Sequence, residues 1–345
     1  RRSKLPPPRE CPMRRQGNGR VRLYRVWPGR SRFLCRGRCV TGGDKDCGVR
    51  CLGGISFASI VTWLCLLGPS ARYFTVALPH LLERSSRCHG TLLSIVSVVL
   101  LLLTSAFLLA TCCTDPGIIP RRRVVLLTGA RAELQARLGY DLLGVGGLQP
   151  TGEPARDAQA LVPPKLRERG FHWCRTCQIV RPPRASHCKD CDQCVVRFDH
   201  HCPFVNNCIG QRNYHYFMGF TTAIMLLFAL VVPVLIWDGL SGAAEEVPGG
   251  GAPVLSAWLR GAAVLGCIFA AYVAVHLLGL WLYHLHLVRR GLTTREHLKH
   301  CLPLEAEEAG GLDVAQEPTL CGAPGPRLFN PRAWVRAPGA WHPPE

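Results

Sequence analysis

Long apolar stretches alternate with charged segments along the chain, and each apolar stretch predicts a membrane-spanning helix. Residues 92–113 are the clearest case, a run of Leu, Val and Ser without one charged side chain, and residues 216–237 are almost as clear. Residues 258–287 form a longer stretch, which ends at the basic pair Arg289 and Arg290. A helix needs about 20 apolar residues to cross a bilayer, so all three are long enough.

A further stretch, residues 52–67, is shorter, and Pro69 and Arg72 follow it closely. A buried helix of a soluble domain is the alternative there. With this stretch included, the pattern predicts an all-α polytopic membrane protein with four transmembrane helices and a polar domain between the second and third.

Charge is separated from the apolar stretches and predicts how the helices are oriented. The chain of 345 residues is 48% hydrophobic yet carries a net charge of +18, and Lys and Arg crowd into residues 1–50 and 121–212. The loop at residues 238–257 has three acidic side chains and no Lys or Arg. By the positive-inside rule, the basic parts and both termini are cytosolic and this loop is luminal or extracellular. A basic nucleic-acid binder, which charge alone would allow, is poorly compatible with four apolar spans.

The same pattern divides the chain into six parts. The first is basic and lacks an apolar h-region, so no cleavable signal peptide is expected. A short helix is expected near residues 130–138 in the linker. The parts are a basic N-terminal region (1–50), the first two transmembrane helices (51–113), a cytosolic linker (114–170), a cysteine-rich domain (171–215), the last two transmembrane helices (216–288) and a cytosolic C-terminal tail (289–345).

Metal-binding side chains are concentrated in the cysteine-rich domain. The chain has 19 cysteines, and seven of them lie between residues 174 and 208 together with three histidines. Cys-x-x-Cys pairs with His in a Lys/Arg-rich segment are typical of zinc sites in a reducing compartment. Two closed tetrahedral zinc sites use eight of these ten side chains and leave two over. The ten are Cys174, Cys177, His187, Cys188, Cys191, Cys194, His200, His201, Cys202 and Cys208.

Four consecutive residues, Asp199, His200, His201 and Cys202, indicate a second kind of chemistry. A carboxylate, an imidazole and a thiol are the set that activates a cysteine, because the imidazole deprotonates the thiol and the carboxylate orients the imidazole. Nearby Lys and Arg side chains would stabilise the thiolate. Spacing alone does not say which histidine is the base. It also leaves open a RING-like scaffold in which all ten side chains bind zinc or are incidental.

The block at residues 174–220 resembles the cysteine-rich domain of the DHHC protein S-acyltransferases, also called palmitoyltransferases. Two flanking motifs agree. The Asp-Pro-Gly sequence that starts at Asp115 is similar to the family's DPG motif, and the Thr-Thr-Arg-Glu sequence that starts at Thr293 is similar to its TTxE motif. The resemblance covers about residues 33–299 with the same four-span layout, and residues 33–46 favour the branch that contains the Ras palmitoyltransferases.

The resemblance implies a role for each candidate residue. His200 would be the base, Asp199 would orient it, and Cys202 would be the nucleophile. Thr294 would brace Asp199, and His201 would bind zinc. Both zinc ions would be structural, because four protein ligands leave no open position. One set of ligands would be Cys174, Cys177, His187 and Cys194, and the other Cys188, Cys191, His201 and Cys208.

The resemblance also implies the reaction and its partners. Cys202 would take a fatty acyl group, palmitoyl first of all, from acyl-CoA and pass it to cysteine thiols of proteins at the cytosolic membrane face, in a ping-pong course. Arg181 and Arg184 are candidates for binding the CoA phosphates. Phe204 stands where the family commonly has Trp, which leaves the chain-length preference open. An accessory subunit is a further candidate partner, and nucleic acid is not expected to be one. The candidate locations are the Golgi, the ER and the plasma membrane.

Other features have plainer explanations. Cys112 and Cys113 at the edge of the second span are expected to pack, with acylation as the alternative. The cysteines before the first span are spaced too irregularly for a third zinc site. The histidines of the last span, His284 among them, are expected to be packed or interfacial. A zinc-dependent scaffold with an idle cysteine is the main rival, and the complete Asp-His-His-Cys set argues against it.

Overall fold

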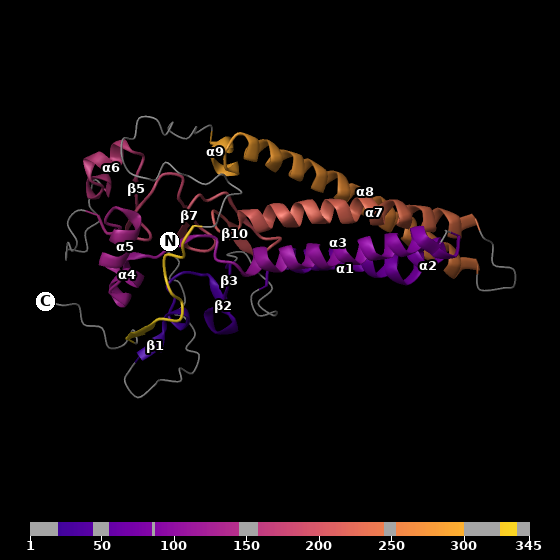
Figure 1. Ribbon diagram of the computed structural model, residues 1–345, viewed down its shortest axis with the longest axis horizontal. Helices are drawn as coiled ribbons and strands as arrows, with labels where there is room; N and C mark the ends of the chain where they lie inside the picture. Colours follow the sequence, from indigo (N-terminus) through magenta and orange to yellow (C-terminus); the bar gives the residue numbers. More distant parts are fainter. Residues whose placement is uncertain are drawn as a thin grey trace.

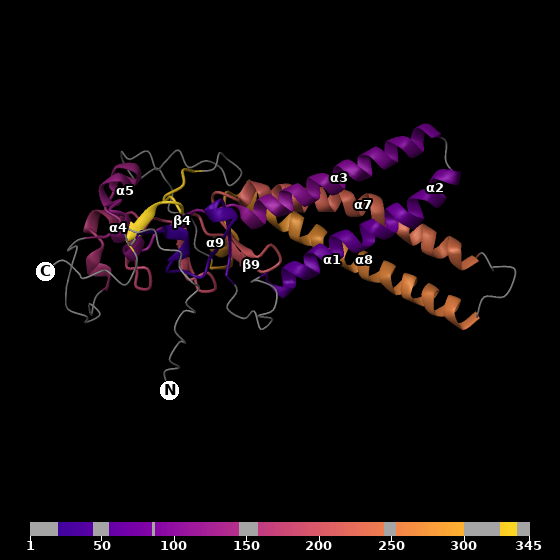
Figure 2. The same ribbon diagram turned by 90° about the horizontal axis from the view of Figure 1, so that it is seen from below.

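The computed structural model describes residues 20–43, 55–84, 87–144, 158–244, 253–299 and 325–336. Its long helices lie together at one end, and short strands and helices gather at the other (Figure 1, Figure 2). Four helices are long and apolar enough to cross a membrane. They correspond to the four apolar stretches of the sequence, so the predicted number of candidate spans is confirmed.

The first span is longer than the sequence predicted. Helix α1 (Phe57–Arg72) continues through a π-helical turn (Tyr73–Ala77) into α2 (Leu78–Arg84), and the candidate span covers Phe57–Glu83. Pro69 lies inside α1 without ending it, because neighbouring helices can satisfy the backbone groups that a proline frees.

The other spans are α3 (Arg87–Cys113), α7 (Tyr214–Ala244) and α8 (Pro253–Arg289). Helix α7 is the most buried of the four spans and packs against both α3 and α8. Its apolar side chains form most of the helical core. At the end of the bundle that is remote from the short strands, Asp238 of α7 forms an ion pair with Arg72 of α1 at 2.9 Å, which ties the first span to the third.

The opposite end is built largely from short β-hairpins, so the all-α class describes the membrane part only. Gln178 and Asp192 each follow the second cysteine of a Cys-x-x-Cys pair and have positive φ angles of 55° and 53°, the left-handed conformation that closes a tight turn. The chain then returns antiparallel to itself. Strands of three residues show no visible alternation in a sequence, which is why they were missed. The hairpins pair β5 (His172–Cys174) with β6 (Ile179–Arg181), β7 (Ser186–Cys188) with β8 (Gln193–Val195), and β9 (His200–Cys202) with β10 (Asn207–Ile209).

The linker before these hairpins packs onto them. Strand β4 (Ile118–Ile119) extends the β7–β8 sheet, and α4 (Arg122–Thr128) and α5 (Arg131–Leu138) follow it. Helix α5 lies where the sequence predicted a short helix. The 3-10 turn η4 (Ala158–Leu161) and α6 (Pro164–Glu168) lead into β5.

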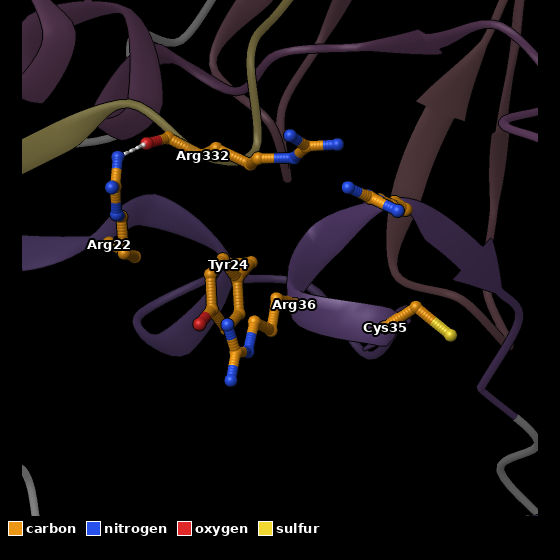
Figure 3. Close-up of a pocket in the computed structure, with 6 residues that line it drawn as sticks. Arg22, Tyr24, Cys35, Arg36 and Arg332 are labelled. Atoms are coloured by element: carbon orange, nitrogen blue, oxygen red, sulfur yellow. Dashed lines mark hydrogen bonds between the residues drawn. The ribbon is translucent and has the colours of Figure 1, made fainter.

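Segments from both ends of the chain close on the same domain. Strand β1 (Arg20–Arg22) pairs with β11 (Trp334–Arg336), and β2 (Arg32–Leu34) pairs with β3 (Cys39–Thr41). The 3-10 turns η1 (Leu23–Arg25) and η2 (Cys35–Gly37) connect these strands. A basic pocket opens where the segments meet, lined by Arg22, Tyr24, Cys35, Arg36, Arg38 and Arg332 (Figure 3).

Candidate active site and metal centres

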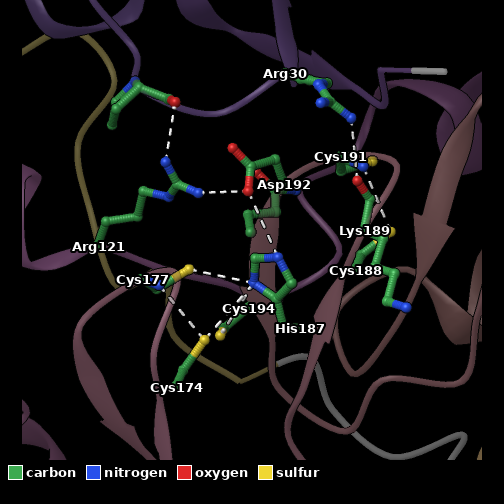
Figure 4. Close-up of polar contacts among 12 residues, drawn as sticks. Arg30, Arg121, Cys174, Cys177, His187, Cys188, Lys189, Cys191, Asp192 and Cys194 are labelled. Carbon is green, nitrogen blue, oxygen red and sulfur yellow. Dashed lines mark hydrogen bonds and ion pairs between the residues drawn. The ribbon is translucent and has the colours of Figure 1, made fainter. Parts of the chain in front are cut away.

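The first metal centre joins two hairpins. Cys174 ends β5 and Cys177 lies in the turn before β6, and His187 and Cys194 face each other across β7 and β8. Nδ1 of His187 lies 3.7 Å from Sγ of Cys174, 3.4 Å from Sγ of Cys177 and 3.8 Å from Sγ of Cys194 (Figure 4). One ring nitrogen therefore points at three sulfurs.

A carboxylate lies beside the second ring nitrogen of His187. Oδ1 of Asp192 lies 3.5 Å from Nε2 of His187, and Arg121 binds the same oxygen at 2.6 Å (Figure 4). A carboxylate beside the second ring nitrogen favours the other nitrogen as the one that faces a metal. The arrangement leaves Nδ1 as the ligand atom.

The second metal centre lies between β7–β8 and β9–β10. His201 and Cys208 face each other across β9 and β10. Nδ1 of His201 lies 3.4 Å from Sγ of Cys191 and 3.6 Å from Sγ of Cys208, and the backbone N–H of Cys191 donates to Sγ of Cys188 at 3.5 Å. The N-terminal segment covers this centre so closely that a Cβ atom at Gly42 would lie 3.2 Å from Sγ of Cys191.

Both centres have the donor set and the spacing of a zinc site. In each, the ligand atoms of three cysteines and one histidine lie within 4.8 Å of one another. A tetrahedral ion with Zn–S of about 2.3 Å and Zn–N of about 2.1 Å places its S and N ligands about 3.6 Å apart, and the measured S···N distances of 3.4 to 3.8 Å agree. The structure thus brings together the same two sets that the resemblance implied. The cysteines described before the first span form no such group, and Cys47 and Cys51 lie outside the described residues.

Strand alternation explains how the two centres interleave without merging. Successive residues of a strand point to opposite faces, so the neighbours His187 and Cys188 on β7 reach different centres. The same rule applies on β9, where His201 reaches a metal centre while His200 and Cys202 point to the other face. The strand separates the two histidines that spacing alone left equivalent.

His200 and Cys202 on that other face form a connected set with Asp199, the residue just before β9. Nδ1 of His200 donates to Oδ2 of Asp199 at 2.6 Å, and the ring also interacts with the Cys202 thiol. Asp199 is only 1% exposed. Thr294, the first residue of α9 (Thr294–Leu298), donates its N–H to Oδ1 at 2.8 Å and its hydroxyl to Oδ2 at 2.7 Å.

Hydrogen bonding overrides burial in setting the pKa values of this set. Burial lowers the pKa of His200, but hydrogen bonds with Asp199 and Cys202 outweigh it and raise that pKa to about 10. Burial raises the pKa of Cys202, but the hydrogen bond with His200 and the charge of that ring hold it below the ordinary value. Burial also raises the pKa of Asp199, and again the bond with His200 lowers it overall. The set therefore favours a thiolate beside an imidazolium, the reactive form of a cysteine.

Cys202 lies where the cysteine-rich domain meets the membrane helices. Its side chain is 8% exposed and belongs to the apolar core that the helices form, together with Val205 and Ile209. Phe204 in the same turn is 56% exposed. Cys202 is thus adjacent both to apolar helix surfaces and to the outside of the domain.

The two arginines that were candidates for CoA have different surroundings. Arg184 binds the carboxylate of Glu296 through Nε at 2.6 Å and Nη2 at 2.9 Å, and donates to the carbonyl of Gly291 at 2.7 Å. Glu296 also accepts the backbone N–H of Thr293 and so caps α9. Arg184 therefore ties the TTxE segment to the cysteine-rich domain, a contact that sequence reasoning missed. Arg181 lies on β6, in a different hairpin from Cys202.

His284 of α8 also lies beside Asp199 and His200 and was missed, since it was expected only to pack or lie at the interface. It is 2% exposed, and one of its ring nitrogens lies within 4.8 Å of ligand atoms of Asp199 and His200. The oxygens of Asp199 already accept three hydrogen bonds from His200 and Thr294. We therefore read this group as a hydrogen-bonded cluster and not as a third metal centre. Its position depends on how α8 packs, and no local sequence pattern signals it.

These features define a class of protein: a chain with two Cys/His centres suited to a metal ion and a buried Asp-His-Cys set, built beside membrane-length helices. The model of the DHHC palmitoyltransferase family matches residues 167–301. Palmitoyltransferase ZDHHC18 of Mus musculus is 31% identical over 329 residues, which cover 92% of this chain and 77% of that protein.

Two other relatives are similar at the same level. Palmitoyltransferase ZDHHC9 of Danio rerio is 32% identical over 289 residues, 81% of this chain and 66% of that protein. Probable protein S-acyltransferase 1 of Arabidopsis thaliana is 31% identical over 330 residues, 93% of this chain and 88% of that protein. The chain belongs to the DHHC palmitoyltransferase family. It is an integral membrane protein with protein S-palmitoyltransferase activity.

Proposed function

We propose that Cys202 carries the acyl group, that His200 is its base and that Asp199 orients His200, with acyl-CoA as donor and cysteine thiols of other proteins as acceptors. The observation that supports these roles is the arrangement on one face of β9. There the thiol interacts with an imidazole whose Nδ1 is held at 2.6 Å by a buried carboxylate. Nε2 of the ring is then left for the thiol.

The first step forms an acyl-enzyme. The Cys202 thiolate attacks the thioester carbonyl carbon of acyl-CoA, an S–C bond forms, and the bond to the CoA sulfur breaks. The departing CoA thiolate takes the proton that His200 holds. Asp199 stabilises the imidazolium throughout, because its charge faces Nδ1.

The second step transfers the acyl group. His200 takes the proton of a substrate cysteine, whose thiolate attacks the carbonyl carbon bound to Cys202. The bond to Sγ of Cys202 breaks, and His200 with the regenerated thiolate is ready for another acyl-CoA. Because the two substrates react one after the other at the same thiol, the kinetics are ping-pong.

Each of the two metal centres is proposed to bind one structural zinc ion. A zinc ion with four protein ligands contributes to folding and offers no open position for chemistry. The ligand His201 lies between His200 and Cys202 on β9. The metal centre would therefore hold the strand that presents the nucleophile and its base.

The acyl chain is proposed to lie among the membrane helices, since Cys202 belongs to their apolar core. Burial contributes about 0.8 kcal/mol for each CH2 group, which makes a C16 chain a strongly held substrate. Phe204, exposed beside the nucleophile, is proposed to contact the acyl donor. Arg181 is retained as a candidate contact for the CoA phosphates. For Arg184 that role competes with its ion pair to Glu296.

The orientation is proposed from charge. The linker and the cysteine-rich domain are rich in Lys and Arg, whereas residues 238–257 have none, and basic segments stay in the cytosol. Both termini and Cys202 would then face the cytosol, where acyl-CoA and substrate proteins at the membrane surface meet the enzyme. Golgi, ER and plasma membrane are the candidate membranes, and an accessory subunit is a candidate partner.

The test is acylation of the purified full-length chain with an alkyne analogue of palmitoyl-CoA. We expect hydroxylamine-sensitive label that Cys202→Ser abolishes and that the matched variant Cys65→Ser, in the first membrane span, retains. Transfer of the label to a cysteine peptide should be lost with Cys202→Ser as well. Label on Cys202→Ser at the level of the unchanged protein would refute the assignment. A labelled enzyme that never passes the label on would favour the scaffold reading.

A further inference from the structure

His284 reaches the catalytic set from the fourth membrane helix, although the proposed mechanism does not use it. Nδ1 of its ring lies 3.1 Å from the hydroxyl of Tyr214, and both side chains are buried. A buried polar group without a partner costs about 1–3 kcal/mol, so this pair holds together. If the Tyr214 hydroxyl donates to Nδ1, the hydrogen bond fixes both the place of the ring and its tautomer.

The ring of His284 also forms one side of the space around His200. The two ring centroids are 5.9 Å apart, with planes inclined by 38°. The Phe217 ring stands edge-on to both rings. Its centroid lies 5.5 Å from the centroid of the His200 ring and 4.9 Å from that of the His284 ring. Tyr214 and Phe217 are three residues apart at the start of α7 and so lie on one face of that helix.

We infer that His284 is a positioning residue for acyl transfer, which keeps His200 aligned with the Cys202 thiol. Asp199 accepts a hydrogen bond from Nδ1 of His200 at 2.6 Å, and a bond at the edge of a planar ring does not by itself fix the tilt of its faces. Phe217 and His284 bound the ring on its other sides. The inference rests on the proposed roles of Cys202 and His200.

A cavity beside His200 is the direct result of removing the His284 ring. The base then spends less time aligned, and Cys202 becomes less reactive towards every electrophile, whether or not that electrophile carries an acyl chain. A side chain that merely lined the acyl-chain site would instead change the binding of acyl-CoA. With a small alkylating reagent, the positioning role therefore predicts slower alkylation of Cys202, whereas the lining role predicts an unchanged rate.

The experiment measures how fast iodoacetamide alkylates Cys202 in the purified full-length chain, followed by mass spectrometry of the peptide that contains this residue. General-base assistance contributes about 100- to 10,000-fold, and His284→Ala is expected to lose part of it, at least about fivefold. Single-turnover acylation by palmitoyl-CoA should slow by the same factor, while the KM for palmitoyl-CoA stays within about twofold. Tyr214→Phe should act in the same direction. His276→Ala, which removes an exposed histidine from the same helix, should change neither rate.

A double-mutant cycle assigns the effect to His200. In a His200→Ala background, His284→Ala is expected to cause no further loss of alkylation, because residues that act through one another are not additive. An equal loss in that background, or unchanged alkylation with a raised KM, would overturn the inference. Zinc content and unfolding temperature are measured for each variant, and if His284→Ala misfolds, Tyr214→Phe decides by the same criteria. If instead His200→Ala and Cys202→Ser acylate normally, the proposed function fails and not this inference alone.

Discussion

Replacing Thr294 tests directly how the buried Asp199 carboxylate is held. Thr294→Val keeps the size of the side chain and the backbone N–H that donates to Oδ1 at 2.8 Å, but it removes the hydroxyl that donates to Oδ2 at 2.7 Å. Oδ2 is also the oxygen that accepts Nδ1 of His200. The position of Oδ2 therefore sets the orientation of the His200 imidazole.

The structure allows the size of the effect to be worked out. A hydrogen bond to a charged group contributes about 1.5–3 kcal/mol, and water cannot readily replace it because Asp199 is buried. If this free energy is lost from the transition state, acylation slows by about 10- to 100-fold, since about 1.4 kcal/mol corresponds to a factor of ten. The loss should appear in the rate of acylation and not in zinc content.

Single-turnover labelling with an alkyne analogue of palmitoyl-CoA measures this rate, and metal analysis and thermal unfolding of the same samples report on folding. Thr294→Ser is the matched control, because it keeps the hydroxyl and removes only a methyl group. We expect it to stay within about threefold of the unchanged enzyme, as modest packing changes do. Wild-type acylation in Thr294→Val, or equal losses in Val and Ser, would refute the reasoning.

Three further predictions follow from the contacts around the site. His201→Ala should remove a metal ligand and lower the zinc content to below two ions per chain, whereas His200→Ala should keep both ions and lose acylation. Equal zinc content in the two variants would contradict the division between these histidines. Glu296→Gln leaves the nearly buried Arg184 guanidinium without its carboxylate. The free energy of unfolding in detergent should therefore fall by about 3 kcal/mol. An unchanged free energy would show that the ion pair is dispensable. Asp115→Asn removes the charge of a carboxylate that accepts two backbone N–H groups at 2.9 Å and faces an arginine at 3.2 Å. The free energy of unfolding should fall by about 1–2 kcal/mol, and the folded enzyme should keep its acylation rate. A large loss of rate would place Asp115 closer to the chemistry.

The membrane helices were predictable because each is a long run of apolar side chains, a signal that needs no tertiary information. The first was underestimated at Pro69, since a proline ends helices in water more readily than among packed helices. The short strands could not be read in the same way, because three residues are too few to show a period.

The catalytic site was predictable only in part. Its residue types and their closeness in sequence indicated an activated cysteine, and the family resemblance divided the ligands, but spacing alone could not separate His200 from His201. That separation depends on a strand in which neighbours face opposite sides. His284 and the partner of Arg184 come from α8 and α9, which reach the site only through packing of the folded chain.

Strand β9 makes this enzyme unequally sensitive to two kinds of genetic change. A point substitution on β9 removes one side chain and leaves its neighbours on their proper sides. A one-codon insertion or deletion there would move every following side chain of the strand to the opposite face. With an insertion just before His200, His201 would turn away from the metal centre while His200 and Cys202 would turn towards it, so both sites would be lost together although every required amino acid was still encoded.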